Sequence, residues 1–320
     1  MPDPETTTGS DPQASAQNWV AQWLRSDVTS APDAPGGPAL PFDPDAPSTG
    51  GNKADATVAP VMFAGYEILG RIGRGGMGTV FRARDPELDR VVALKVISGK
   101  DADDTAARTR FDRESKALAA LKHPNVVTVY RAGTWQGSPY FTMEYVPGGA
   151  LNKRVGRFRG DPAAAARLVA KVARAVQALH DAGVLHRDLK PHNILLGPGD
   201  EPLVADFGLV KKLGDDSDAS VTGAPMGTRQ YMSPEQTYGQ KANYTPACDI
   251  WAVGVVLYEL LAGARPFPSL NPIDVYLEVR AANPVPLRDH DPAVPADLAA
   301  VVAKCLRKNP ADRYPTAAAV

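Results

Sequence analysis

The sequence predicts an α+β fold in which a small β-rich part is followed by a larger, mainly helical part. First, residues 66–145 contain short stretches that alternate in polarity or run β-branched, with turns between them. Second, the chain becomes mainly helical after Pro147. Hydrophobic residues make up 44% of the 320 residues, which supports a well-filled core.

Five stretches of the first part are predicted as strands, because their polar and apolar residues alternate or because they are rich in β-branched residues. They cover residues 66–72, 79–85, 90–97, 126–133 and 139–145. Between the third and the fourth strand, residues 105–121 are predicted to be helical, with Phe111, Leu118 and Leu121 on the apolar side. The first part is therefore expected to hold a small sheet and one helix.

The first long helix of the second part has a clear start signal. Asp161 is a good N-cap residue, and Pro162 fits the first helical position. We expect this helix to extend to His180. The other predicted helices cover residues 246–262, 271–282, 296–307 and 311 onward.

Residues 1–60 differ from the rest of the chain. They hold ten of its 30 prolines, and Ser, Thr, Asp and Gly fill most of the remainder, so we predict a disordered tail. Residues 16–25 interrupt it with Trp19 and Trp23 at positions i and i+4 of one apolar stripe. This stretch is either a transient helical turn or a helix that docks on a partner or on the folded part.

The overall net charge of −1 hides an asymmetry between the two ends of the chain. Residues 1–60 carry eight acidic and two basic side chains, whereas residues 61–320 carry 28 acidic and 33 basic ones. The small total argues against a protein that binds nucleic acid or an anionic membrane. A mildly basic folded part suits an anionic nucleotide.

Two features predict a cytoplasmic, soluble chain without a membrane segment. The only cysteines, Cys248 and Cys305, show no pairing or metal-ligand spacing, which fits a reducing compartment. No run of 18 apolar residues occurs, and no charged-then-apolar leader opens the chain. Cys248 lies in an apolar helical context and is expected to be a buried structural thiol.

A glycine-rich stretch, residues 73–78, lies between the first two predicted strands. Glycines let the backbone approach a polyphosphate closely, so that its amides can point at the phosphate oxygens. Alone, this G-x-G-x-x-G pattern equally suggests a dinucleotide-binding turn. However, it leads into a strand instead of a helix. In the third strand, Lys95 requires a nearby anion, either a phosphate or a structural carboxylate.

The most informative stretch is residues 186–193, which read His-Arg-Asp-Leu-Lys-Pro-His-Asn, followed by Asp-Phe-Gly at residues 206–208. Together they supply a carboxylate to orient a hydroxyl, a lysine for phosphate charge and two oxygen donors for magnesium. With the glycine-rich stretch and Lys95, they make residues 66–320 resemble a eukaryotic-type (Hanks-type) serine/threonine protein kinase, most like the bacterial members. The resemblance implies a β-rich N-lobe at 66–145 and a helical C-lobe at 146–320, with a truncated last helix.

The resemblance also implies a role for each matching residue. Asp188 would orient the substrate hydroxyl, Lys190 would neutralise charge on the transferred phosphate, and Lys95 would pair with Glu114. Asn193 and Asp206 would hold Mg²⁺, with Mn²⁺ as a substitute. Besides these residues, those expected around ATP are Ile72, Gly73, Gly75, Gly76, Gly78, Val80, Ala93, Met143, Glu144, Val146 and Leu195.

The same resemblance also implies how the enzyme is regulated and which residues support the catalytic loop. Arg187 before Asp188 is typical of kinases that are activated by phosphorylation of the activation loop. We expect the phosphate at Ser217, Ser220 or Thr222, with Thr222 as the first choice. One copy would phosphorylate another within a transient dimer. Thr228 is expected to hydrogen-bond to Asp188 and Lys190. The expected structural supports are Asp249 beneath the catalytic loop, an ion pair of Glu235 with Arg313, and an apolar spine of Leu118, His186 and Phe207.

Two other classes of protein share part of this pattern. A pseudokinase would lack Lys95, Asp188 or Asp206, and all three are present. A phosphotransferase acting on small molecules would not need the activation segment or the Ser-Pro-Glu sequence at residues 233–235 that ends it. The sequence therefore favours an enzyme that phosphorylates serine and threonine in proteins.

Overall fold

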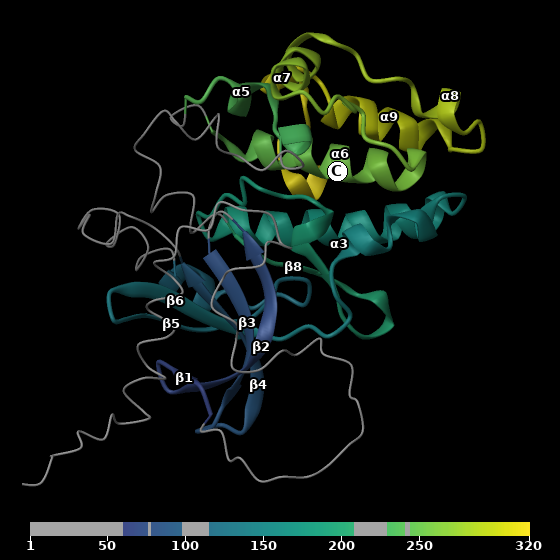
Figure 1. The fold of residues 1–320 in the computed structure, drawn as a ribbon. Helices are drawn as coiled ribbons and strands as arrows, with labels where there is room; N and C mark the ends of the chain where they lie inside the picture. The colour runs from purple at the N-terminus through teal and green to yellow at the C-terminus, as the bar shows by residue number, and fades with distance from the viewer. Residues whose placement is uncertain (1–59, 76–77, 98–114, 208–228, 241–243) are drawn as a thin grey trace, which may run out of the picture. The chain divides into compact units, whose positions relative to one another are not determined.

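The computed structural model describes residues 60–75, 78–97, 115–207, 229–240 and 244–320 (Figure 1). The tail with its two tryptophans, Gly76, Glu114, Thr228 and the three activation-loop hydroxyls lie outside the described residues. The chain divides into two compact units. Unit 1 contains residues up to 98 and 133–145, and unit 2 contains residues 99–132 and 146–320.

A six-stranded sheet in the order β1-β2-β3-β4-β6-β5 forms the first half of the fold (Figure 1). Its first four strands pair as antiparallel neighbours, and β6 pairs antiparallel to β4. The predicted strands are recovered, and the third has the predicted bounds. The strands are β1 (Met62–Phe63), β2 (Tyr66–Gly75), β3 (Gly78–Asp85), β4 (Arg90–Ile97), β5 (Val129–Trp135) and β6 (Ser138–Glu144).

The prediction that the fourth strand begins at residue 126 is wrong, because residues 125–127 bond to another strand. The amide of Val127 donates to the carbonyl of Val204, and the amide of Val204 donates to the carbonyl of Asn125. The side chain of Asn125 also donates to Pro202 O at 2.8 Å. These bonds attach the segment to β8 (Pro202–Val204), which pairs antiparallel with β7 (Ile194–Leu196) in unit 2.

Two long helices lie side by side in unit 2, α3 (Pro162–Asp181) and α6 (Pro246–Ala262) (Figure 1). Asp161 caps α3 as predicted, because its side chain accepts from the amide of Ala164 at 2.9 Å. Nearly every side chain of α6 is buried, which explains why the helix is apolar on all sides. The bounds predicted for α6 are confirmed.

Residues 115–120, which lie within the helix predicted at 105–121, are helical. The other shorter α-helices in the described part of unit 2 are α5 (Pro234–Thr237), α7 (Pro272–Ala281), α8 (Leu287–His290) and α9 (Ala296–Cys305). The helix predicted from residue 311 onward is wrong. The chain instead forms two short 3₁₀ turns, η7 (Pro310–Asp312) and η8 (Ala317–Ala319). Arg313 between them is extended, with φ −80° and ψ −176°, and Pro315 limits the residue before it. Among the described helices, none combines the length and apolar character that a membrane crossing requires.

Candidate active site

In unit 1, the glycine-rich stretch forms the facing ends of β2 and β3. Gly75 pairs with Gly78 across this hairpin, and Gly73 pairs with Val80. Gly78 has φ +138°, and a Cβ atom there would lie 2.1 Å from the carbonyl oxygen of Val96. Only glycine fits this position, because β3 passes too close to the backbone of β4 for any side chain.

Strand β4 places Lys95 in the middle of the sheet of unit 1. It lies opposite Val80 on β3 and opposite Phe141 on β6, and only 6% of its surface is exposed. Its Nζ atom is 5.9 Å from the centre of the Phe141 ring. Ala93, two residues earlier, pairs with Met143, and both side chains are buried. Since strand side chains alternate, Ala93 and Lys95 point to the same face.

In unit 2, the catalytic loop brings Asp188, Lys190 and Asn193 into mutual contact. The Nζ atom of Lys190 lies 3.0 Å from Oδ2 of Asp188. The side-chain amide of Asn193 donates to the same carboxylate oxygen at 3.2 Å and to the backbone carbonyl of Asp188 at 2.8 Å. The carboxyl group is 11% exposed and the Lys190 side chain 16%. One anionic oxygen therefore sits between two donors, with limited access to water.

The hairpin β7–β8 explains how residues 13 positions apart become neighbours. Asn193 directly precedes β7, Asp206 follows β8 by two residues, and the amide of Ala205 donates to the carbonyl of Asn193 at 2.8 Å. Asp206 has φ +58°, a left-handed conformation that is unusual for a residue with a side chain. Leu195 lies on β7 and pairs with Leu203.

This donor set fits one hard divalent cation. The amide nitrogen of Asn193 is occupied by Asp188, which leaves the oxygen Oδ1 as its ligand atom. A carboxylate and an amide oxygen suit Mg²⁺, which keeps several waters and is completed by substrate phosphates. Within the described ranges, no group of three or more His, Cys, Asp or Glu side chains could hold a metal by itself.

The catalytic loop rests on the buried carboxylate of Asp249, which is on α6. Its Oδ2 accepts from the amide of His186 at 2.9 Å, and its Oδ1 accepts from the amide of Arg187 at 2.8 Å. Arg187 has φ +62°, and Gln236 of α5 donates to its carbonyl at 3.0 Å. Asp249 and α5 therefore fix an otherwise unfavourable backbone directly before Asp188.

His180 is a supporting residue that the sequence did not predict. It ends the apolar stripe of α3, and its Nε2 lies 2.8 Å from Oδ2 of Asp249. Both side chains are almost fully buried. Burial alone would raise the pKa of Asp249, but the hydrogen bonds from His180 and from the amide of Arg187 hold this pKa below its ordinary value. The carboxylate thus stays ionised and aligned beneath the loop.

His186 is fixed as a neutral ring. Its burial lowers its pKa below the ordinary value and outweighs the opposing charges of Asp249 and Asp188. Its Nδ1 accepts from the amide of Asp188 at 3.3 Å, and its Nε2 donates to the carbonyl of Ala205 at 3.1 Å. The ring also contacts Phe207, with 6.1 Å between ring centres. His186 thereby links the two segments that carry Asp188 and Asp206.

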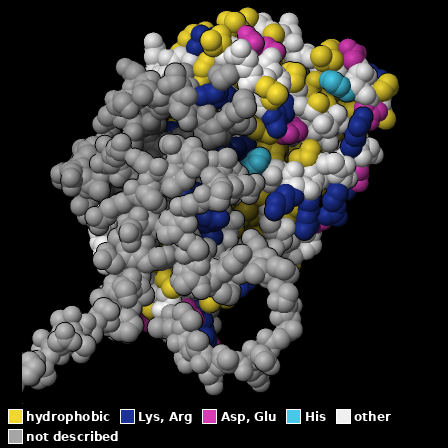
Figure 2. Space-filling model, viewed as in Figure 1, with side chains coloured by type: hydrophobic (Ala, Val, Ile, Leu, Met, Phe, Trp, Pro, Cys, Tyr) yellow, Lys and Arg dark blue, Asp and Glu magenta, His cyan; other side chains and the backbone are white. Residues whose placement is uncertain are grey.

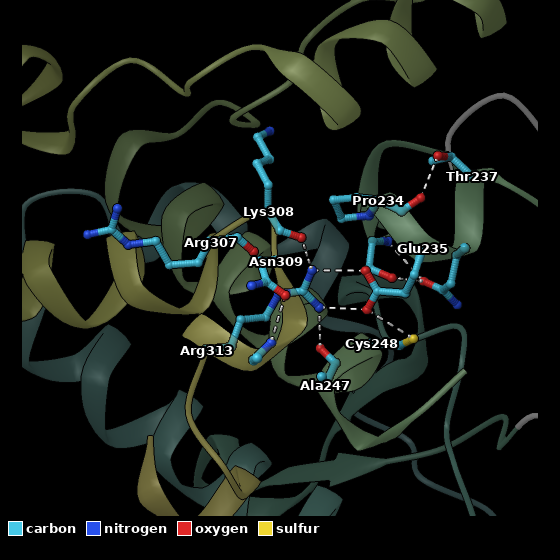
Figure 3. Close-up of polar contacts among 12 residues, drawn as sticks. Pro234, Glu235, Thr237, Ala247, Cys248, Arg307, Lys308, Asn309 and Arg313 are labelled. Atoms are coloured by element: carbon cyan, nitrogen blue, oxygen red, sulfur yellow. Dashed lines mark hydrogen bonds and ion pairs between the residues drawn. The ribbon is translucent and has the colours of Figure 1, made fainter. Parts of the chain in front are cut away.

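The segment that contains α5 is anchored by the ion pair of Glu235 and Arg313 (Figure 3). The two guanidinium Nη atoms lie 2.6 and 2.9 Å from the two carboxylate oxygens. The remaining donors reach the backbone carbonyls of Ala247, Arg307 and Lys308. Burial would raise the pKa of Glu235, but Arg313 outweighs it and holds this pKa below its usual range.

Leu118, His186 and Phe207, which the sequence groups as a spine, are all buried in unit 2. Cys248 is buried as predicted, and its thiol lies 3.3 Å from Oε1 of Glu235. Of the residues that the sequence predicts around ATP, Val146 is also buried, Glu144 is partly exposed and Ile72 is half exposed. Gly76, Glu114 and Thr228 lie outside the described part of the chain.

Comparison with known proteins identifies the same pattern. The family model described as a protein kinase domain matches residues 66–320. The serine/threonine-protein kinase PknB of Mycobacterium leprae is 38% identical over 268 residues, which are 82% of this chain and 43% of that protein. PknB of Mycolicibacterium smegmatis is 41% identical over 261 residues, 79% of this chain and 41% of that protein. The chain thus spans less than half the length of these relatives.

Among solved structures, the kinase domain of Mycobacterium tuberculosis PknI has a TM-score of 0.64 to this fold. The two sequences are 30% identical, and the similarity covers 82% of this chain and 96% of that domain. The expected combination of an antiparallel sheet and a mainly helical part is confirmed.

Proposed function

This chain belongs to the protein kinase family, and from that membership we propose that it transfers the γ-phosphate of ATP to serine and threonine hydroxyls of proteins. The observation that carries the proposal is the contact of Lys190 and Asn193 with one oxygen of Asp188. This arrangement suits an oriented hydroxyl nucleophile and an anionic phosphoryl group. The sequence match alone does not require this contact of Lys190 and Asn193 with one carboxylate oxygen.

We assign the chemical roles as follows. Asp188 accepts a hydrogen bond from the substrate hydroxyl and directs the hydroxyl oxygen at the γ-phosphorus. As the new oxygen–phosphorus bond forms, the bond from the γ-phosphorus to the β-γ bridging oxygen breaks, ADP leaves, and Asp188 receives the hydroxyl proton. Lys190 lies beside it and offsets the negative charge on the transferred group. Lys95 positions the α- and β-phosphates. Asn193 and Asp206 would hold a Mg²⁺ or Mn²⁺ ion, which would supply positive charge against the phosphates.

Serine and threonine are the proposed acceptors. Lys190, two residues after Asp188, resembles the arrangement in serine/threonine kinases, and the PknB relatives are named serine/threonine-protein kinases. A small-molecule phosphotransferase is less well supported, since the anchor of Glu235 and Arg313 serves a segment that such enzymes do not need. We place the reaction in the cytoplasm, where ATP and Mg²⁺ are available.

The first prediction tests the transfer itself. Incubation with magnesium, γ-labelled ATP and a generic protein substrate should label the substrate. Lys95→Met should reduce the initial rate by at least about 10²-fold, because misplaced phosphates lose the in-line geometry. Lys116→Met, which changes an exposed lysine, is the matched control and should retain the wild-type rate. Equal rates for wild type and Lys95→Met would rule out the assigned nucleotide site.

The second prediction concerns activation by autophosphorylation in trans, between two transiently associated copies. We expect phosphate within residues 217–222, mainly at Thr222, because Arg187 precedes Asp188 and can pair with a phosphate. A phosphate adds about −1.5 to −2 charges at pH 7 and can order a loop through charge-assisted hydrogen bonds. Peptide mapping by mass spectrometry gives the position.

Two variants separate regulation from chemistry. Phosphatase treatment should lower the activity of the wild type, and Thr222→Ala should be insensitive to it. Full activity of the triple alanine variant of Ser217, Ser220 and Thr222 would disprove activation at this loop, while leaving the transfer reaction intact.

A further inference from the structure

One surface of unit 2 concentrates positive charge. We define the basic face by six side chains from the segment of η1 (Leu151–Lys153) and η2 (Val155–Phe158), including the residue between them, and from α3. They are Lys153, Arg154, Arg157, Arg167, Lys171 and Arg174. On α3 the three basic residues are at positions i, i+4 and i+7, so they lie along one side of the helix. The opposite side of α3 is buried. Figure 2 shows Lys and Arg side chains gathered where Figure 1 draws α3.

Ion pairs with one turn hold the basic face together. Asp200 accepts from Arg154 at 2.5 Å and from Arg157 at 3.1 Å. The next residue, Glu201, pairs with Lys171. The turn between β7 and β8 therefore lies against both the 3₁₀ segment and α3, and it brings Arg154, Arg157 and Lys171 onto one surface. Arg167 and Arg174 extend this surface along the same side of α3, and Lys153 directly precedes Arg154.

The two acidic residues neutralise only part of this charge. Six cations against two carboxylates leave a net charge of +4 on the face. Within the described ranges, the side chains of Lys153, Arg167 and Arg174 form no ion pair, and all three are exposed. Since residues 61–320 carry a net charge of +5, this face holds a charge comparable to the whole excess of the folded part.

Residues 1–60 carry a charge excess of the opposite sign, with eight acidic and two basic side chains. Four of its acids, Asp27, Asp33, Asp43 and Asp45, fall within 19 residues that contain no lysine or arginine. We propose that this acidic segment binds the basic face of the same molecule.

Covalent attachment favours this occupant over a free anionic partner. A segment of 59 residues extends to roughly 200 Å, so it reaches any surface of a folded part of this size, whatever the placement of the two units. Tethering also gives an effective concentration on the order of 1 mM. Many weak contacts to exposed cations are sufficient at such a concentration, and no single fixed conformation is required.

The test uses the full 320-residue chain with a nitroxide attached at Ser30→Cys. Cys248 and Cys305 are buried, and burial raises the pKa of each thiol to about 12, so labelling is selective. In about 50 mM salt, the paramagnetic relaxation enhancement that the nitroxide causes should be at least about threefold larger for the amide protons of residues 153–174 than for those of α8 and α9. In about 0.5 M salt the difference should vanish, because the Debye length falls to a few Å.

Paired charge reversals supply the control. Arg167→Glu with Arg174→Glu should abolish the local enhancement, because the reversed charges repel the acidic segment. Among the described residues, neither arginine has an ion-pair partner whose loss would disturb the fold. Arg288→Glu with Arg307→Glu makes the same change in charge at exposed positions on α8 and after α9, and should leave the enhancement unchanged. Equal losses in both pairs would overturn the proposal, since only the total charge would then matter.

Other occupants appear as distinct outcomes. Mixing spin-labelled chain with ¹⁵N-labelled chain that carries no nitroxide detects relaxation enhancement between molecules. Enhancement in this mixed sample, but not within one molecule, would mean that a second copy covers the basic face. Binding of phosphatidylserine vesicles through Arg167 and Arg174, without local enhancement from the tail, would assign the face to a membrane. Either result contradicts the proposal. A rescue variant gives direct support. It adds lysine at positions 27, 33, 43 and 45, in place of Asp27, Asp33, Asp43 and Asp45, to the Arg167→Glu, Arg174→Glu protein, and we expect it to restore the contact between the tail and the basic face.

Discussion

Asp188→Asn should reduce the rate of phosphoryl transfer by at least about 10²-fold, the usual scale for a positioned acid–base group. The amide keeps the size of the side chain and one acceptor oxygen, but it cannot receive the hydroxyl proton. It also removes the anion between Lys190 and Asn193, whose donors lie 3.0 and 3.2 Å from Oδ2. Initial rates with γ-labelled ATP and a protein substrate give the comparison.

The fold and the affinity for ATP should change little in this variant. The loop backbone is fixed by Asp249 through the amides of His186 and Arg187, and these bonds do not involve the Asp188 side chain. Asp181→Asn, at the exposed end of α3, is the matched control and should keep the wild-type rate. A purified Asp188→Asn protein with near-wild-type transfer would show that another group receives the proton.

Arg313→Met should cause the largest loss of stability, about 3–5 kcal/mol, as expected when one partner of a buried ion pair is removed. The Arg313 side chain is fully buried, and it donates to both oxygens of Glu235 and to three backbone carbonyls. Methionine fills much of the space but leaves these five acceptors without their donor. In a domain of this size we expect a fall in Tm of roughly 10 °C or more.

Glu235→Met combined with Arg313→Met provides the test of mechanism. If the cost arises from an uncompensated buried charge, the double variant should be more stable than the sum of the single effects predicts. Arg307→Met, at an exposed neighbouring position, should have little effect. A loss below about 1 kcal/mol in Arg313→Met would contradict the anchoring role.

The effect of Arg313 on stability should also depend on pH. The pKa of Glu235 is lowered in the folded protein, so the ion pair stabilises the fold fully above the pKa of the unfolded chain, about 4.3. This contribution is lost as the pH falls through the folded value. The difference in unfolding free energy between wild type and Arg313→Met should therefore shrink below about pH 4.

Much of the fold could be predicted because local signals and tertiary packing agree. Asp161 and Pro162 start α3 where the capping preference places them, and α6 ends at Gly263, whose φ of +70° suits glycine. The apolar run of α6 also matches its complete burial. At the site, the spacing of Asp188, Lys190 and Asn193 was sufficient to predict their proximity, since they lie within six residues.

The remaining features depend on contacts between distant segments. Val127 is β-branched and reads as part of the strand at 126–133, but its amide is used by Val204. His180 has an ordinary helical position in the sequence, and only the packing of α3 against α6 brings it to Asp249. Arg187 adopts a left-handed backbone conformation that its residue type does not indicate, because tertiary hydrogen bonds from Arg187 to Asp249 and from Gln236 to Arg187 hold it.

The identity of the phosphorylated residue tests the central claim most directly. A protein substrate incubated with the wild-type chain, magnesium and γ-labelled ATP is hydrolysed in acid, and its phosphoamino acids are separated. We predict phosphoserine and phosphothreonine, and at least about 10²-fold less of both in the parallel sample with Asp188→Asn. Label found only in inorganic phosphate, or only in phosphotyrosine, would contradict the assignment of this chain as a kinase of protein serine and threonine residues.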